Sequence, residues 1–402
     1  MLSSQPLTDP KSSAGFTPTN TMHSGPLENI PEPTLVTARE HLEEIVGDLA
    51  LATRLSLDIE SNGFYAYREK VCLLQISSAA EDYIVDPIAV ADLSSLAPLM
   101  ADPAIEKIFH AGEYDVLCLK RDHGFTFSNL FDTMIASRLL GVKELGLAAL
   151  IERHFGYKLS KKLQRADWGK RPLTHAQVRY AQLDTHFLIA LADILQEQLR
   201  LKGRLDDAVE AFAELTEVEP VTKVFDPEGY WRLAGRQNLT GAQLACLREI
   251  YHFREDQAQS RDRAHFRVMA DELMLKVACA MPQTMNELAA VRGMTPYLMQ
   301  KFGHALLKTV RRGCESQPPA PGPRVRARRD MRELKLFESL RQWRKTQAEQ
   351  EAVEPVVIVS SEVLREIARL AILGEGDPVA RLTELKRRRY GAAISAILKN
   401  AV

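Results

Sequence analysis

A regular alternation of apolar and polar side chains marks residues 55–60, which read Leu-Ser-Leu-Asp-Ile-Glu. Successive side chains of a strand point to opposite faces, so this stretch predicts a strand with one apolar face and with Asp58 and Glu60 on the other. Carboxylates beside a core are unfavourable unless something neutralises them, and a divalent cation with its preference for carboxylate oxygen can do so. The same pattern is also typical of an ordinary strand with a polar end.

The segments that follow predict an α/β domain with a partly antiparallel sheet and flanking helices. Strands are expected at residues 71–76, 83–85, 107–110 and 129–131. The first two are separated by a short turn and should form an antiparallel hairpin. Helices are expected at residues 37–49, 93–100, from about 114 onward, and at 133–140. A long helix is expected from Thr174 to Leu199, where Thr174 and Gln177 form a capping box.

From residue 226 the pattern becomes entirely helical and contains an internal repeat. Residues 247–278 align without gaps, 90 positions on, with residues 337–368. The copies are separated by a segment rich in proline and arginine, which is typical of a semi-rigid linker. The first 33 residues are rich in Ser, Thr, Pro and Gly and are expected to be disordered. The expected domains are residues 1–33 (leader), 34–215 (α/β), 226–314 (first helical copy), 315–330 (linker) and 331–402 (second copy).

Composition adds few constraints. A chain of 402 residues fits two or three domains, and its 46% apolar and 26% charged residues are ordinary. The five cysteines are scattered without a CxxC pair, which argues against a structural zinc site or a disulfide framework and fits a reducing cytoplasm. No run of 18 apolar residues and no apolar signal segment occurs, so we expect neither a transmembrane helix nor a secretory signal.

Two further acidic positions accompany the opening stretch. Tyr180 and Asp184 are four residues apart and therefore lie on one face of the expected long helix. Asp115 ends the segment HAGEYD at residues 110–115. Taken singly, Asp115 is typical of a first-turn residue that complements the helix dipole, and Asp184 is typical of a paired carboxylate near a core.

Together these segments resemble the three exonuclease motifs of the DEDD superfamily. The matching stretches are DIES at 58–61, HAGEYD at 110–115 followed by LFDT at 130–133, and YAQLD at 180–184. The tyrosine four residues before the last aspartate resembles the DEDDy branch, and DWGKRPLTHAQVRYAQLD resembles the third motif of ribonuclease D. The helical copies resemble the HRDC module that follows the nuclease domain in that family. The resemblance covers about residues 34–400 and implies an RNase H-like α/β exonuclease domain with a mixed sheet, followed by two all-α HRDC-like domains.

The resemblance also implies an activity: a 3′→5′ exoribonuclease that trims RNA 3′ ends, releases 5′-mononucleotides and serves tRNA maturation. It implies two divalent ions, Mg²⁺ or Mn²⁺, held by Asp58, Glu60, Asp115 and Asp184. Two cations about 3.5–4 Å apart stabilise the attacking water and the leaving 3′ oxygen of an in-line displacement. Oxygen ligands favour these ions over zinc.

Other residues receive roles beside the metal ligands. Tyr180, with an unperturbed pKa near ~10, is expected to orient the attacking water rather than deprotonate it. Asp132 of LFDT is expected to be structural. The expected partner is RNA, bound by a cytoplasmic monomer, and the expected substrate contacts are Phe64, Tyr67, His110, Lys162, Arg165 and Arg171.

Alternatives remain open for these contacts and for the activity. The first motif departs from many relatives, which carry an aromatic residue directly after the glutamate, so Phe64, Tyr65 and Tyr67 either stack on bases or pack within their own loop. The basic loop at 158–171 either binds phosphates or is simply solvated. A DNA 3′→5′ exonuclease shares the DEDDy motifs, but no polymerase domain follows them here. A non-catalytic nucleic-acid-binding protein is disfavoured by the intact carboxylates and Tyr180.

Overall fold

The computed structural model describes residues 30–220, 224–235, 237–320 and 330–401. Most of the expected disordered leader and most of the expected linker therefore lie outside the described residues. Among the described residues, no helix combines the length and the apolar character that spanning a bilayer requires.

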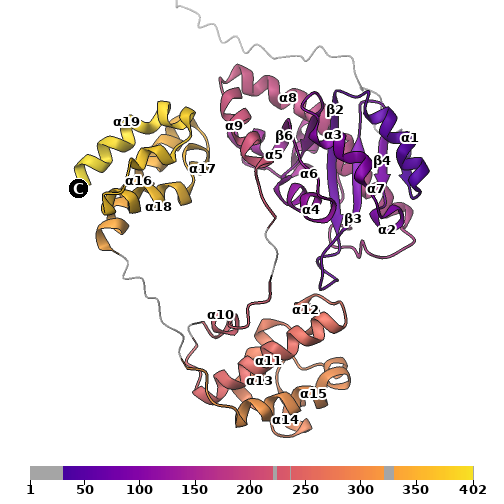
Figure 1. Cartoon of the computed structure of the whole chain (residues 1–402), viewed down its shortest axis with the longest axis vertical. Coiled ribbons are helices and arrows are strands. Elements are labelled where there is room, and N and C mark those ends of the chain that lie inside the picture. Colours follow the sequence, from indigo (N-terminus) through magenta and orange to yellow (C-terminus); the bar gives the residue numbers. More distant parts are fainter. Residues whose placement is uncertain (1–29, 221–223, 236, 321–329, 402) are drawn as a thin grey trace, which may run out of the picture. The chain divides into compact units, whose positions relative to one another are not determined.

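The α/β domain, which runs from β1 to α9, contains a six-stranded mixed sheet with helices on both faces (Figure 1). Its strand order is β1-β4-β3-β2-β5-β6, in which β3 is antiparallel to both of its neighbours and the other pairs are parallel. The strands are β1 Thr34–Val36, β2 Arg54–Ser61, β3 Val71–Ser77, β4 Asp82–Val85, β5 Glu106–Phe109 and β6 Leu130–Asp132. The expected mixed sheet and its hairpin are confirmed.

The helices of this domain follow the expected positions with two corrections. They are α1 Arg39–Leu49, α2 Pro87–Val90, α3 Ala97–Ala101, α4 Glu113–His123, α5 Thr133–Leu139, α6 Leu147–Phe155, α7 His175–His186, α8 Leu188–Leu201 and α9 Leu205–Thr216. The helix expected at 93–100 is a short 3-10 turn, Ser94–Leu96, followed by α3. The long helix expected from Thr174 to Leu199 is two helices, because the chain leaves the first one at the buried Phe187.

Strand β2 has the two unlike faces that its alternation predicts. Leu55, Leu57 and Ile59 are buried in the main core with residues of α1 and α4. On the opposite face Ser56 is also buried, and its hydroxyl donates to the carbonyl oxygen of Thr185 on α7 at 3.0 Å. A small polar side chain therefore allows a helix to dock on the face that carries Asp58.

The internal repeat forms two helical units. Helical repeat 1 contains α10 Tyr230–Ala234, α11 Gly241–Ser260, α12 His265–Val268, α13 Asp271–Ala280, α14 Met285–Ala290 and α15 Pro296–Glu315. Helical repeat 2 contains α16 Met331–Glu351, α17 Pro355–Ile358, α18 Ser361–Leu373, a 3-10 turn Pro378–Arg381 and α19 Glu384–Ala401. Each unit has its own buried apolar cluster.

A buried arginine shows that the two units share one internal design. Arg254 donates from Nη1 to the carbonyl oxygen of Met269 at 3.2 Å, and Arg344 donates to that of Val359 at 2.8 Å. Both arginines and both carbonyls are 90 residues apart in the sequence. A buried guanidinium needs hydrogen-bond acceptors, so this shared contact ties the middle of the long helix to the turn before the next one.

Candidate active site

Three carboxylates from two segments converge at one end of the sheet. Asp58 and Glu60 of β2 and Asp184 of α7 each place an oxygen within 4.8 Å of the other two. Alternation along β2 puts Asp58 and Glu60 on one face, and α7 covers that face. Residues 124 positions apart in the sequence thus share one site.

Helix α7 is fixed in register by polar contacts next to Asp184. The hydroxyls of Ser77 and Thr185 are 2.7 Å apart, and Thr185 also accepts the hydrogen bond from Ser56 through its carbonyl oxygen. One turn away, Asp82 of β4 lies 2.6 Å from the side-chain nitrogen of Gln182. These contacts hold α7 in the register in which Asp184 meets Asp58.

Helix α4 brings Asp115 to the same region. Asp115 is 7% exposed, and the backbone amide of Ile59 donates a hydrogen bond to its carboxylate. Gly112 is the N-cap of this helix, and an added Cβ there would lie 2.4 Å from the Cβ of Phe109, so a larger residue would displace the first turn. The amide of Gly112 donates to Asp132 at 2.8 Å, and Asp132 also caps α5. Asp132 therefore has the structural role expected from the sequence.

The four carboxylates strongly disfavour their own ionisation. Burial, followed by the charge of Asp184, raises the pKa of Asp58 well above its usual range. Burial and the neighbouring carboxylates raise the pKa of Glu60 to about 10, and burial together with Asp115 raises that of Asp184 to about 7. Burial and the charge of Asp58 raise the pKa of Asp115 as well. No lysine or arginine among the described residues offsets these charges, so the site fits a divalent cation with oxygen ligands.

Tyr180 lies one helical turn before Asp184 and is supported by a tryptophan. The ring of Trp168 is 5.9 Å from that of Tyr180, and Trp168 is only 1% exposed. Burial and the charge of Asp184 raise the pKa of Tyr180 above its usual value, so its hydroxyl keeps its proton at neutral pH. Sequence reasoning missed Trp168, although a tryptophan inside a polar basic loop is a signal that part of the loop is buried.

The expected substrate contacts fall into two groups: side chains that already bind partners within the protein, and side chains that are exposed to solvent. The guanidinium of Arg171 binds Asp86 and the carbonyl oxygen of Cys72, at 2.7 and 2.8 Å through Nη2. His110 lies 2.9 Å from the hydroxyl of Thr133, and burial lowers its pKa to about 4. Because these partners belong to the α/β domain itself, the contacts of Arg171 and His110 stabilise its fold.

The remaining expected contacts lie on two loops. Phe64, Lys162 and Arg165 are exposed. Tyr67 donates from its hydroxyl to Glu255 of helical repeat 1. Tyr67 of the aromatic loop after β2 thus contacts helical repeat 1, so this loop does not pack only on itself.

The comparisons with known proteins agree with this geometry. Residues 33–200 match the family model described as a 3′-5′ exonuclease, and residues 243–310 and 333–398 match the HRDC domain. The chain is 31% identical to ribonuclease D of Gluconacetobacter diazotrophicus over 283 residues, which are 70% of this chain and 72% of that protein. This chain belongs to the ribonuclease D family.

Eukaryotic relatives extend the family further. The exosome complex component 10 homolog of Caenorhabditis elegans is 31% identical over 307 residues, 75% of this chain but only 35% of the worm protein. The catalytic core of RRP6 from Trypanosoma brucei matches with a TM-score of 0.66 and 33% identity, covering 72% of this chain and 81% of that structure. The ribonuclease D fold, with an exonuclease domain followed by HRDC domains, is therefore established for this chain.

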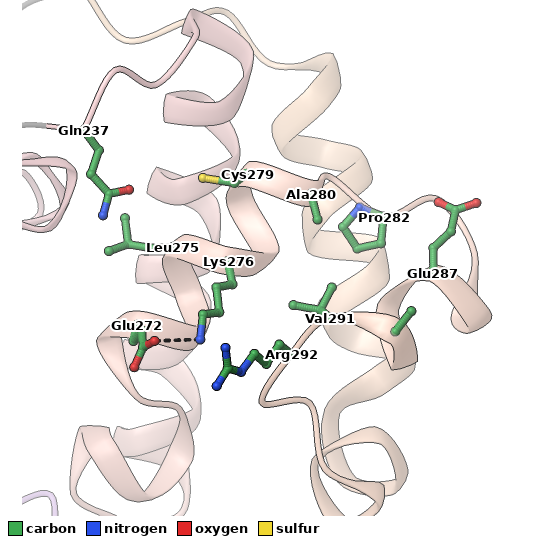
Figure 2. Close-up of a pocket in the computed structure, with 11 residues that line it drawn as sticks. Gln237, Glu272, Leu275, Lys276, Cys279, Ala280, Pro282, Glu287, Val291 and Arg292 are labelled. Carbon is green, nitrogen blue, oxygen red and sulfur yellow. Dashed lines mark ion pairs between the residues drawn. The ribbon is translucent and has the colours of Figure 1, made fainter.

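A cavity of about 810 Å³ lies elsewhere, within helical repeat 1 (Figure 2). It is bordered by residues of α13 and α14, and the ion pair between Glu272 and Lys276, at 2.6 Å, lies at its edge. Among the described residues, the carboxylates suited to a metal ion gather in the α/β domain and not at this cavity.

Proposed function

We propose that this protein is a 3′→5′ exoribonuclease of ribonuclease D type that hydrolyses RNA from its 3′ end and releases 5′-mononucleotides. The observation that carries the proposal is the convergence of Asp58, Glu60 and Asp184 within 4.8 Å. Buried carboxylates with raised pKa values and no cationic partner cluster where function requires them, because such an arrangement costs stability. The relationship to ribonuclease D indicates that the function of these carboxylates is hydrolysis of RNA.

The proposed metal ligands are Asp58, Glu60 and Asp184, with Asp115 beside them, and the proposed ions are two Mg²⁺ or Mn²⁺. Bound divalent ions would neutralise these carboxylates and stabilise the charge that develops on the attacking and leaving oxygens. Asp58 contributes from a rigid strand, and Asp184 from a helix fixed on that strand by hydroxyl contacts. The chain itself therefore holds the ligands in place.

Tyr180 is proposed to orient the attacking water. Its pKa is raised by burial and by Asp184, so less of the phenolate that could act as a base is present at neutral pH than in a free tyrosine, and the hydroxyl stays available as a donor. No hydrogen bond within the described residues uses this hydroxyl, and the ring rests on Trp168. A water molecule beside the carboxylates is a suitable partner for it.

The proposed substrate is single-stranded RNA at the 3′ ends of precursors such as those of tRNA, bound by a monomer. Phe64, Lys162 and Arg165 are the exposed residues proposed to contact it. A cytoplasmic location is proposed because all five cysteines have free thiols, which suits a reducing compartment.

The test uses RNA and DNA oligonucleotides of one sequence, labelled at the 5′ end, with Mg²⁺ or with EDTA. We expect stepwise shortening of RNA from the 3′ end, release of 5′-mononucleotides, no cleavage of circular RNA and no reaction in EDTA. Asp184→Asn should abolish hydrolysis and leave a folded protein. Asp256→Asn is the matched control, because Asp256 is an exposed carboxylate outside the site.

Three outcomes contradict the proposal. Full activity of Asp184→Asn in Mg²⁺ would remove the metal-ligand assignment. Degradation of DNA with RNA left intact would replace the proposed substrate by DNA. RNA binding without hydrolysis in either metal would leave a binding protein rather than an enzyme.

A further inference from the structure

Two exposed aromatic rings face each other where the loop after β2 contacts helical repeat 1. Phe64 of the loop is 50% exposed, and Phe266 of α12 is 55% exposed. Their ring centroids are 6.4 Å apart and their planes are nearly perpendicular. Large apolar rings gathered on a surface mark a contact site more often than isolated ones do.

The loop that carries Phe64 is held by its own backbone. The amides of Tyr65 and Ala66 donate to the carbonyl oxygen of Asn62 at 2.7 and 2.9 Å, and the side-chain oxygen of Asn62 accepts from the amide of Lys70 at 2.9 Å. Asn62 is 7% exposed. Phe64 therefore stands on an ordered turn, and placing its ring for a ligand costs little conformational entropy.

Contacts on both sides fix the turn to its neighbours. The hydroxyl of Tyr65 donates to the carbonyl oxygen of Arg165 at 2.9 Å, and the carbonyl oxygen of Tyr65 accepts from the amide of Ala264 at 3.1 Å. The guanidinium of Arg267 lies 3.7 Å from the centroid of the Tyr65 ring. Tyr65, in the middle of the turn, thus joins the basic loop of the α/β domain to helical repeat 1.

Two arginines flank the aromatic pair. The guanidinium carbon of Arg165 is 6.0 Å from the Phe64 ring, and that of Arg267 is 5.8 Å from the Phe266 ring. Neither arginine forms an ion pair with a carboxylate in the part of the chain that the structure describes. Arg267 also donates to the carbonyl oxygen of Phe64, and no carboxylate of the described residues offsets either charge, unlike that of Arg171, which Asp86 neutralises.

The position of the pair relates it to the carboxylate site. Phe64 follows Glu60 by four residues, so the two lie within about 14 Å of each other, the reach of an extended chain. Aromatic faces beside unpaired arginines are the combination that binds single-stranded nucleic acid, because bases stack on the rings and phosphates bind the cations.

We propose that Phe64 and Phe266, with Arg165 and Arg267, form a stacking site for a base of single-stranded RNA, upstream of the 3′-terminal nucleotide held by the carboxylates. This inference rests on the proposed exoribonuclease function. It gives helical repeat 1 a direct part in holding the substrate. It also restricts the part to one repeat, because Val356 and Val357 of α17 occupy the positions of Phe266 and Arg267.

The experiment measures RNA binding by the full chain in EDTA, where hydrolysis is prevented. The probe is a single-stranded oligoribonucleotide with one 2-aminopurine, placed in turn at each position from the 3′ end. With the wild-type protein, we expect fluorescence quenching at one internal position. With Phe266→Ala, we expect loss of that quenching and about tenfold weaker binding, because alanine offers no ring on which a base can stack. Val356→Ala, at the equivalent place in helical repeat 2, is the matched control and should bind as the wild type does.

A second variant separates stacking from charge. Arg165→Gln should lower the slope of log affinity against log salt by about 0.7, the value of one phosphate contact on a single strand, whereas Phe266→Ala should leave that slope unchanged. Phe266→Ala should slow hydrolysis of a longer oligoribonucleotide more than hydrolysis of a dinucleotide, which offers only one base upstream of the 3′-terminal nucleotide.

The inference would be overturned by wild-type affinity and quenching in Phe266→Ala, or by equal loss in Val356→Ala. It would also be overturned if Phe266→Ala slowed dinucleotide hydrolysis as much as that of longer RNA, since the ring would then support the carboxylate site. If the wild-type protein hydrolyses RNA while these results appear, only this inference fails. If the wild type neither binds nor hydrolyses RNA, the proposed function itself fails.

Discussion

Replacing Asp58 by asparagine should stabilise the protein in the absence of metal, although Asp58 is proposed to bind it. The carboxylate of Asp58 is buried beside Asp184, and its charge is the second largest cause of the raised pKa values of both Glu60 and Asp115. Asparagine has nearly the same shape and carries no charge. The substitution therefore removes the cost of burying one carboxylate and weakens the repulsion on its neighbours.

The size of the effect follows from Asp184, a carboxylate of the same cluster. Its pKa rises from 3.8 to about 7, which corresponds to about 4 kcal/mol of free energy lost by the folded state once the group is ionised. Relaxation and entry of water reduce such costs in real proteins, so we expect about half of this value, ~2 kcal/mol. For a domain of this size, that difference raises the melting temperature by about 4–8 °C.

The assay is thermal unfolding at pH 8 in EDTA and in Mg²⁺. The wild-type protein should gain about 2.7 kcal/mol when Mg²⁺ is at a hundredfold excess over its dissociation constant, and Asp58→Asn should lose most of this gain. Asp132→Asn is the control, because this buried carboxylate accepts from the amides of Met134, Ile135 and Gly112, each at 2.8 Å. An amide nitrogen facing one of these donors should cost about 2 kcal/mol in both buffers.

In EDTA, Asp58→Asn is therefore expected to raise the melting temperature and Asp132→Asn to lower it. If Asp58→Asn melts below the wild type in EDTA, the carboxylates of the metal-free site do not repel one another as their burial and spacing indicate. If Mg²⁺ stabilises Asp58→Asn as much as the wild type, Asp58 is not a ligand.

Three further predictions concern pH, the tyrosine and the second repeat. In EDTA, the free energy of unfolding should fall as the pH rises from about 4 to about 7, because folded Asp184 keeps a proton that the unfolded chain has lost; urea unfolding at each pH measures this, and a rise over the same window would contradict it. Tyr180→Phe should lower kcat about a hundredfold with little change in RNA affinity; wild-type turnover by the variant would remove the water-orienting role. Ser361→Asp should stabilise helical repeat 2 by about 1 kcal/mol, because Arg344 has only the Ser361 hydroxyl at 3.1 Å where Arg254 has Asp271; an unchanged or lower melting temperature would refute this.

The sequence predicts those parts of the fold that produce a local pattern of residues. The alternation around Asp58 specifies both the strand and the face that carries the carboxylate. The capping box at Thr174 specifies where α7 begins, and both of its reciprocal hydrogen bonds are present. Nothing equivalent marks the end of α7, because the apolar pattern continues through Phe187 into α8. The break depends instead on contacts from distant segments, such as the ring of Phe155, 5.4 Å from that of Phe187.

The candidate site shows the same limit. The carboxylates and Tyr180 are identified because their motifs, each confined to a few residues of one element, resemble those of a known exonuclease family. The partners of Tyr67 and Arg171 are not found that way. Glu255 is 188 residues from Tyr67, and Asp86 is 85 residues from Arg171. A sequence shows that such side chains are polar or charged. Whether they bind a partner within the protein depends on how distant helices and strands pack together.

Comparison of the two helical repeats distinguishes the interior residues that both copies need from the surface residues that can differ between them. Both must bury one guanidinium on one carbonyl, and both do so through equivalent residues, Arg254 and Arg344. Their four-residue helices α12 and α17 are also equivalent, yet they read HFRV and PVVI. The aromatic ring of α12 is therefore not required to fold such a repeat, since the second copy folds without one, whereas Arg267 contacts the Tyr65 ring and the carbonyl oxygen of Phe64. A surface ring that the repeat does not require, and that faces the exposed Phe64 ring at 6.4 Å, is best explained by a ligand.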